Sequence, residues 1–275
     1  MTIFIERIAA IASDYDVIVF DQWGVLHNGT TPYPDAIEAV EALTGTKAVL
    51  SNSGKRSEPN AARIAQMGFA TDVFDGVMTS GEALWRDIHD GKIEGGTFLA
   101  IERQPGDATD WTNGLDIEIT SDPNTADAVL LMGLPDGATL GDWTEQVGIW
   151  IDKGLPLYCS NPDRQSPRAG GLVTSPGALA FDFQAAGGDV TFYGKPHRPV
   201  FEALETEFGP GRYLMVGDSM EHDIAGAHAA GWDSLLVQGG LYADRFRDAD
   251  GETVIAAIAA EKSCDPPTYR IEGLR

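Results

Sequence analysis

Short runs of β-branched and apolar residues alternate along this chain with segments whose apolar residues recur at helical spacing. The clearest run covers 17–20 and ends abruptly at Asp21. Further strands are expected at 47–50, 76–79, 190–193, 213–216 and 234–237, and helices at 35–43, 57–67, 82–89, 199–208 and 224–230. Because alternation of this kind builds a parallel sheet covered on both faces, the pattern predicts an α/β fold.

The middle of the chain carries a second set of elements. Strands are expected at 97–101, 117–120, 128–132 and 157–159, and helices at 140–150 and 178–186. We interpret 81–188 as an α/β domain inserted into the first, so that 1–80 and 189–275 form one discontinuous domain. A chain of 275 residues is long enough for two such cores.

The composition limits the classes of partner. The chain has 42 acidic and 19 basic residues, a net charge of −23, which disfavours binding to nucleic acid or to anionic membranes. No run of apolar residues approaches a membrane span, and no secretory signal is recognisable. Only Cys159 and Cys264 occur, so we expect no disulfide framework and a cytoplasmic location. An anionic ligand would need local positive charge.

Polar residues stand where the predicted strands of the first domain end. They are Asp21, Ser51, Lys195 and Asp218. Ligands of open parallel sheets bind at the carboxyl ends of the strands, so these residues are expected to meet. Each alone has an ordinary explanation, since polar residues often follow apolar strands. Together they favour a site in which Asp21 is a carboxylate nucleophile.

A second acidic residue, Asp223, follows Asp218 in the same loop. Asp218 and Asp223 either cap the following helix or aim two acids at one point. If Asp21 and Asp218 converge at about 5 Å, their repulsion costs about 3 kcal/mol at an effective dielectric near 20. Mg²⁺ would neutralise this repulsion, and no cluster of His and Cys competes for another metal. The acids therefore predict a magnesium site.

Two further features suit an anionic phosphate. Lys195, in Gly194-Lys195-Pro196, would offset phosphate and carboxylate charge, although such a tripeptide is often only a turn. The Ser51 hydroxyl and the backbone amides of Asn52 and Ser53 would donate hydrogen bonds to phosphate oxygens. Phosphate binding is therefore expected at the end of the strand at 47–50.

These motifs resemble the haloacid dehalogenase superfamily, in particular its class IIA, NagD-like branch of sugar and nucleotide phosphatases. The matching pieces, in family order, are Asp21–Leu26, Leu50–Ser53, Thr79–Gly81, Ser160–Asp163, Gly177–Leu179, Gly194–Pro196 and Gly217–Asp218 with Asp223. They extend over nearly the whole chain. The resemblance implies a Rossmann-like core and an α/β cap inserted between the second and third motifs.

The resemblance also implies roles for individual residues. Asp21 would attack phosphorus, while Ser51 and Lys195 hold the phosphoryl group. Asp21, Asp218, Asp223 and the backbone carbonyl of Trp23 would bind Mg²⁺. The loop with Asn161 and Asp163 would face the leaving group of the substrate, while Asn52 and Ser53 would bind its phosphate. The ligand would be a small phosphorylated metabolite, and aromatic residues of the cap are candidates for a homodimer interface.

Trp23 departs from the pattern that the resemblance implies. Phosphatases of this superfamily usually carry there a second Asp, which protonates the leaving group and then activates water. An indole N–H cannot exchange a proton usefully. His27 and Glu221 are candidate replacements. We therefore expect a slow Mg²⁺-dependent phosphatase working through an aspartyl-phosphate on Asp21, with a non-catalytic phospho-ligand sensor as the alternative.

Overall fold

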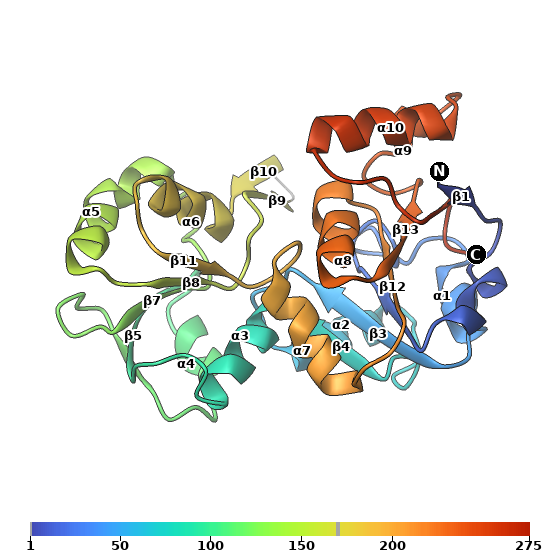
Figure 1. Ribbon diagram of the computed structural model, residues 1–275. Coiled ribbons are helices and arrows are strands. Elements are labelled where there is room, and N and C mark those ends of the chain that lie inside the picture. Colours follow the sequence, from blue (N-terminus) through green and yellow to red (C-terminus); the bar gives the residue numbers. More distant parts are fainter. Residues whose placement is uncertain (1, 169–170) are drawn as a thin grey trace. The chain divides into compact units, whose positions relative to one another are not determined.

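The computed structural model describes residues 2–168 and 171–275, which fall into two compact units. The first unit contains the chain up to Ser51 together with Glu58–Met78 and Lys195–Arg275. The second unit contains Asn52–Ser57 and Thr79–Gly194. Each unit is built on its own sheet (Figure 1).

The first unit has a seven-stranded sheet in the order β1-β14-β13-β12-β2-β3-β4. Its strands are β1 (Ile3–Phe4), β2 (Val17–Phe20), β3 (Thr46–Ser51), β4 (Gly76–Thr79), β12 (Tyr213–Gly217), β13 (Asp233–Val237) and β14 (Tyr269–Ile271). The pairings of β2 with β3 and with β12 are parallel, as are those of β13 with β12 and β14. The predicted α/β fold is confirmed.

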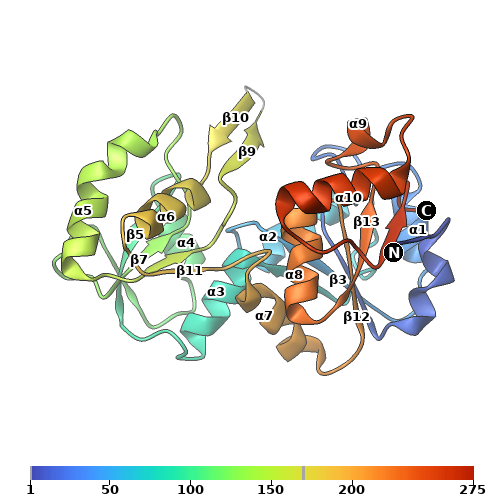
Figure 2. The same cartoon turned by 45° about the horizontal axis from the view of Figure 1, so that its top comes forward.

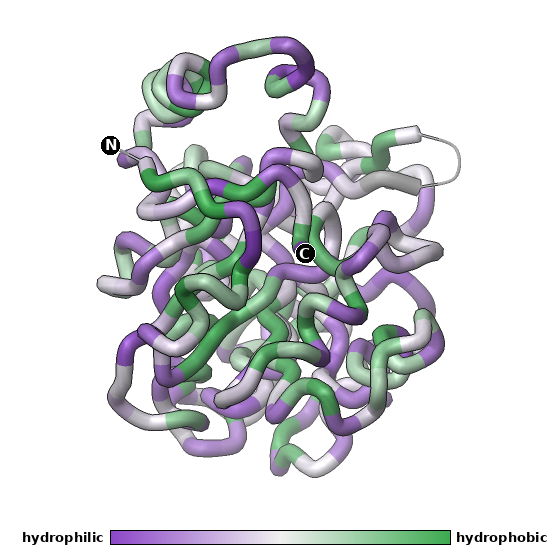
Figure 3. Tube along the Cα trace, turned by 90° about the vertical axis from the view of Figure 1, so that its right-hand side faces the viewer, coloured by the Kyte–Doolittle hydropathy of each residue, from purple (hydrophilic) through white to green (hydrophobic). Residues whose placement is uncertain are grey.

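Helices cover this sheet because its central strands are apolar on both sides. All residues of β2 are buried, which requires a partner layer on each face. The helices of the unit are α1 (Ala36–Glu41), α2 (Ser57–Gln66), α7 (Arg198–Phe208), α8 (Ala225–Ala230), α9 (Ala243–Phe246) and α10 (Gly251–Lys262). Ala36, Val40 and Ile64 pack with Ile18 and Phe20 in one core cluster. In Figure 3, hydrophobic stretches run through the interior of the tube, and hydrophilic stretches are frequent in its outer turns.

The second unit has a five-stranded parallel sheet in the order β11-β8-β7-β5-β6. Its strands are β5 (Thr97–Ile101), β6 (Glu118–Thr120), β7 (Ala128–Leu131), β8 (Leu157–Cys159) and β11 (Val190–Phe192). Its helices are α3 (Ser80–His89), α4 (Asp107–Trp111), α5 (Thr144–Lys153) and α6 (Pro176–Ala185). An antiparallel hairpin of β9 (Gln165–Arg168) and β10 (Gly171–Thr174) completes it (Figure 2).

Several predictions about the elements were wrong. The strand predicted at 190–193 was expected in the first sheet, but β11 (Val190–Phe192) pairs with β8 at the edge of the second sheet. The strand at 234–237 was expected to be the last, yet β14 follows it and pairs with it. Helix α10 and the β9–β10 hairpin were not predicted. The assignment of a catalytic core to 1–80 with 189–275, and of a cap to 81–188, stays a prediction.

Within the described residues, none of the helices combines the length and the apolar character needed to cross a bilayer.

Candidate active site

Asp21 lies at the carboxyl end of the central strand β2. Its backbone N–H donates to the Val216 carbonyl of β12 at 2.9 Å, which continues the ladder between the two strands and fixes where the side chain leaves the sheet. Only 13% of the Asp21 side chain is exposed. A buried carboxylate at this position needs a cation or hydrogen-bond donors nearby.

Asp218 directly follows β12, and Asp223 lies in the short π-helical turn η4 (Met220–Ile224) that leads into α8. One carboxylate oxygen of Asp223, Oδ2, accepts the backbone N–H groups of Asp218 and Ser219, both at 3.0 Å. Ser219 caps the turn, because its hydroxyl accepts the His222 N–H at 3.2 Å. Asp223 therefore shapes this turn with Oδ2, while its other oxygen, Oδ1, lies 2.7 Å from the Lys195 ammonium.

Lys195 holds this cluster together. Its ammonium Nζ lies 2.5 Å from Asp21 Oδ1 and 2.7 Å from Asp223 Oδ1. It also donates to the Leu50 carbonyl at 3.2 Å, which places the end of β3, next to Ser51, beside the cluster. Asp21, Asp218 and Asp223 each offer an oxygen within 4.8 Å of the others. The structure thus brings together the acids and the lysine that the sequence singled out.

The cluster carries more negative than positive charge. One ammonium faces three carboxylates, all of them largely buried. Burial raises the pKa of Asp21 to about 7, although Lys195 opposes this shift. Burial, the Asp21 charge and the Asp223 charge raise the pKa of Asp218 to about 8. An oxygen-only donor set with uncompensated charge fits a hard divalent cation such as Mg²⁺.

These shifts predict proton-linked binding of Mg²⁺. The folded, metal-free cluster holds protons that the unfolded chain has lost, so its contribution to the free energy of unfolding falls as pH rises from about 4 to about 8. Mg²⁺ displaces those protons, and its stabilisation should therefore grow over the same range. We expect the rise in Tm caused by excess Mg²⁺ to be larger at about pH 8 than at about pH 5. Calorimetric scans with and without the ion measure this, and a rise independent of pH would contradict it.

Glycines enclose the Asp218 carboxylate. A Cβ built on Gly24 would lie 1.6 Å from Asp218 Oδ2, and one on Gly240 would lie 2.4 Å from the same atom. The Leu241 N–H donates to this oxygen at 2.7 Å. Gly240 and Leu241 were not predicted as part of the site, although the Gly-Gly pair at 239–240, directly after an apolar strand, was an available signal.

We expect the Gly24→Ala variant to lose its response to Mg²⁺. The new Cβ would push the Asp218 carboxylate out of the cluster, and Gly24 also has a positive φ of 82°. Gly45→Ala is the matched control, because Gly45 has a φ of 93° and open space around its Cα. Gly45→Ala should cost only the backbone strain of about 1–2 kcal/mol and keep the Mg²⁺ response. Isothermal titration with Mg²⁺ compares the two variants.

The Trp23 side chain, which the sequence places where an acid/base was expected, is 44% exposed. Its indole lies over Gly29, where a Cβ would be 2.2 Å from the ring, and meets the His27 ring edge-on at 6.0 Å. His27 is fully buried, its Nδ1 accepts the Gly29 N–H at 3.0 Å, and burial lowers its pKa to about 4. A buried neutral imidazole is a poor replacement for the missing acid/base. The role of the Trp23 carbonyl as a metal ligand stays a prediction.

The other predicted substrate residues belong to the second unit. Asn52 Nδ2 donates to Asp163 Oδ1 at 2.8 Å, and Asn161 Oδ1 accepts the Asp163 N–H at 2.9 Å. The structure therefore joins the loop after β3 to the loop after β8. Ser53 lies in the same loop as Asn52, and its carbonyl accepts the Gly81 N–H at 3.0 Å. Substrate contacts by these four residues stay predictions.

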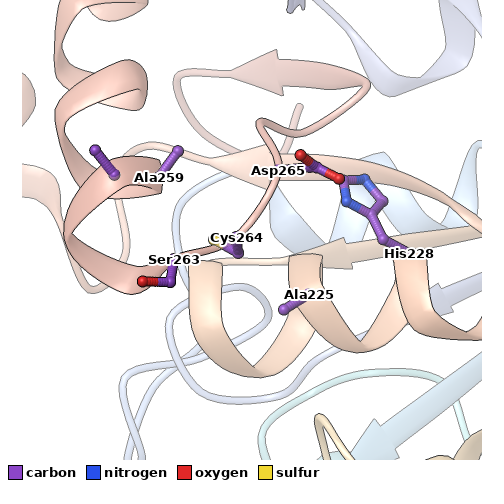
Figure 4. A pocket seen from close by; sticks show the side chains of 7 residues that line it. Ala225, His228, Ala259, Ser263, Cys264 and Asp265 are labelled. Atoms are coloured by element: carbon purple, nitrogen blue, oxygen red, sulfur yellow. The ribbon is translucent and has the colours of Figure 1, made fainter.

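A cavity of about 420 Å³ lies elsewhere in the first unit, against α8, α10 and the segment that follows α10 (Figure 4). Its walls include His228, Cys264 and Asp265. Burial raises the pKa of the Cys264 thiol, so this thiol is not activated as a nucleophile. The cavity contains none of the predicted site residues.

Known proteins resemble both the sequence and the fold. Residues 18–107 match the haloacid dehalogenase-like hydrolase family, and residues 192–260 match the HAD-hydrolase-like family. Bovine chronophin (Bos taurus) is 28% identical over 273 residues, which cover 94% of this chain and 90% of chronophin. A haloacid dehalogenase-like hydrolase from Brucella suis 1330 has a crystal structure with a TM-score of 0.79, 28% identity, and coverage of 98% of this chain and 100% of that one.

A third similar protein is the D-glycerol 3-phosphate phosphatase of Mycobacterium tuberculosis. It is 25% identical over 250 residues, which cover 84% of this chain and 65% of that protein. Its crystal structure in complex with magnesium has a TM-score of 0.69 and 24% identity, and the match covers 84% of this chain and 70% of that one. The parallel α/β fold and the order of the matched segments are those of haloacid dehalogenase-like proteins. The chain belongs to the haloacid dehalogenase-like hydrolases.

Proposed function

We propose that this protein is a Mg²⁺-dependent phosphatase of small phosphorylated metabolites, with Asp21 as the nucleophile. The observation that carries the proposal is the cluster itself: Asp21, Asp218 and Asp223 converge within 4.8 Å around the Lys195 ammonium. The phosphatases among the similar proteins, and the magnesium complex of one of them, support it.

In this reaction a carboxylate oxygen of Asp21 forms a bond to phosphorus while the bond from phosphorus to the alcohol oxygen breaks. Lys195 offsets negative charge on the phosphoryl oxygens, and the Ser51 hydroxyl donates a hydrogen bond to them. Asp21, Asp218 and Asp223, with the Trp23 carbonyl, would hold the Mg²⁺, which neutralises phosphoryl charge. The departing alkoxide takes its proton from solvent, because Trp23 has none to give. A water molecule then attacks phosphorus, the bond from phosphorus to the Asp21 oxygen breaks, and inorganic phosphate and the free Asp21 carboxylate result.

The substrate class that we infer is a phosphate monoester of a small polar alcohol. Similar proteins are named as acting on glycerol 3-phosphate, which is such an ester. Asn52, Ser53 and Asn161 carry donors suited to phosphate oxygens or hydroxyls, and the Asp163 carboxylate is an acceptor suited to a hydroxyl of the alcohol. We also predict a homodimer that forms through the cap, and a cytoplasmic location.

Trp23 favours a second candidate, a sensor that binds a phospho-ligand without turning it over, because an indole cannot protonate a leaving group. A panel of phosphorylated metabolites with p-nitrophenyl phosphate, read by phosphate release with Mg²⁺ and with a chelator, separates the two. A phosphatase releases phosphate in the presence of Mg²⁺, and the chelator abolishes this release. A sensor binds a member of the panel in calorimetry and releases none, which would overturn the phosphatase.

A further inference from the structure

The loop 52–57 follows β3 and includes Ser57, the first residue of α2, yet it belongs to a different unit from β3 and from the rest of α2. Contacts group β3 and Glu58–Met78 with the first unit, and they group Asn52–Ser57 with the second. The loop directly follows Ser51, the last residue of the strand whose Leu50 carbonyl accepts from Lys195. The residues expected to bind phosphate are therefore held by the inserted part of the chain.

The start of helix α3, with its N-cap Thr79, anchors the backbone of the loop. The Gly81 N–H donates to the Ser53 carbonyl at 3.0 Å, and the Thr79 hydroxyl donates to the Lys55 carbonyl at 2.6 Å. The approach is so close that a Cβ on Gly81 would lie 2.1 Å from the Gly54 carbonyl oxygen. The loop backbone thus lies directly on the first turn of this helix.

Glu82 of α3 binds the loop through its side-chain carboxylate. It is only 7% exposed, and its Oε2 accepts from Arg56 Nε at 2.7 Å and from the Ser57 N–H at 3.2 Å. Although burial opposes it, hydrogen bonds from Arg56 and Ser57 lower the pKa of Glu82, so the carboxylate is charged. The Arg56 guanidinium also lies 3.7 Å from the centre of the Trp85 ring. A charged, buried, multiply bonded carboxylate fixes the end of the loop firmly.

We propose that Glu82 is a positioning residue, which holds the loop 52–57 in the conformation that binds the phosphate group of the substrate. This inference rests on the proposed phosphatase function. A loop that is already ordered loses less conformational entropy when its amides at Asn52 and Ser53 bind an anion, so it binds more tightly. The interaction of Glu82 with Arg56 can be removed by substitution without changing any residue of the acidic cluster.

The variants Glu82→Gln and Arg56→Gln test the inference. In both, we expect the Kd of inorganic phosphate, measured by calorimetry with Mg²⁺ present, to rise about tenfold or more. The KM for p-nitrophenyl phosphate should rise in parallel, with a smaller change in kcat. The double variant should be no worse than the poorer single variant, because both substitutions remove the same contact. The Kd for Mg²⁺ should stay unchanged, since Asp21, Asp218 and Asp223 lie in the first unit.

Arg86→Gln is the matched control. Arg86 also donates to Glu82, at 3.2 Å, but it lies on α3 one turn later and not in the loop. Phosphate binding should change less than twofold in this variant. An equal loss in Arg86→Gln and Glu82→Gln would show that the charge matters for the helix and not for the loop, which overturns the inference.

The remaining outcomes separate the two proposals. Normal phosphate binding in Glu82→Gln and Arg56→Gln, with a wild type that hydrolyses phosphate esters, overturns the positioning role alone. A wild type that neither binds phosphate nor hydrolyses esters overturns both proposals. If Glu82→Gln fails to fold, Arg56→Gln still decides, because that side chain is 28% exposed and its truncation leaves no large cavity.

Discussion

The Asp21→Asn variant should lose Mg²⁺-dependent hydrolysis of p-nitrophenyl phosphate by at least about 10³-fold. The amide oxygen of Asn cannot form a stable bond to phosphorus. Because the Asn side chain has nearly the same size as that of Asp, the substitution should leave the packing unchanged. The lost charge also weakens the contact with Lys195 Nζ, which lies 2.5 Å from Asp21 Oδ1. Phosphate release under saturating substrate and Mg²⁺ measures the effect.

Asp14→Asn is the control for this substitution, because Asp14 is exposed in the same unit and should leave the rate unchanged. Circular dichroism and Tm show whether Asp21→Asn is folded. Calorimetry with Mg²⁺ separates a lost nucleophile from a lost metal. A folded Asp21→Asn protein that binds Mg²⁺ and hydrolyses at the wild-type rate would refute the assignment of the nucleophile.

Trp23→Asp should accelerate hydrolysis, and most for esters with poor leaving groups. A carboxyl group two residues after Asp21 would supply the general acid–base step, which is typically worth about 10²–10⁴-fold. The indole is 44% exposed and rests on Gly29, so its replacement should cost little stability. The kcat for a glycerol phosphate compared with that for p-nitrophenyl phosphate is the measurement.

Trp23→Asn separates proton transfer from access, since it removes the same indole and adds no titratable group. If both variants gain equally, the indole merely obstructs the site. A folded Trp23→Asp protein with an unchanged or lower rate would indicate that Trp23 contributes to binding, or that another step limits turnover.

Local sequence pattern predicted much of the fold. The strands at 97–101 and 157–159 were predicted with their observed bounds, because apolar runs there are flanked by glycine and proline. The sheet to which a strand belongs was harder to predict, because the composition of a strand such as Val190–Phe192 is compatible with either sheet. Strand β14 was not predicted, because its three residues have an arginine in the middle and show no apolar pattern. Its pairing with β13 identifies it as a strand.

The acidic cluster was predictable for a different reason. Asp21, Asp218 and Lys195 carry distinctive chemistry and stand at the ends of recognisable segments. The Leu241 N–H was not predictable, because a backbone donor has no residue type. Glu82 looked like an ordinary acid in the first turn of a helix, and only the folded chain reveals that it accepts from a loop 25 residues earlier.

The grouping of Asn52–Ser57 with the second unit matters for anyone exchanging specificity between related phosphatases. A chimaera that swaps only the stretch from Thr79 to Gly194 would place a foreign helix against the native loop. Where that helix lacks a carboxylate in the place of Glu82, Arg56 would lose its partner, and such hybrids should bind phosphate poorly even when both halves fold. Transplanting the short upstream segment along with the insert would keep the native partners together.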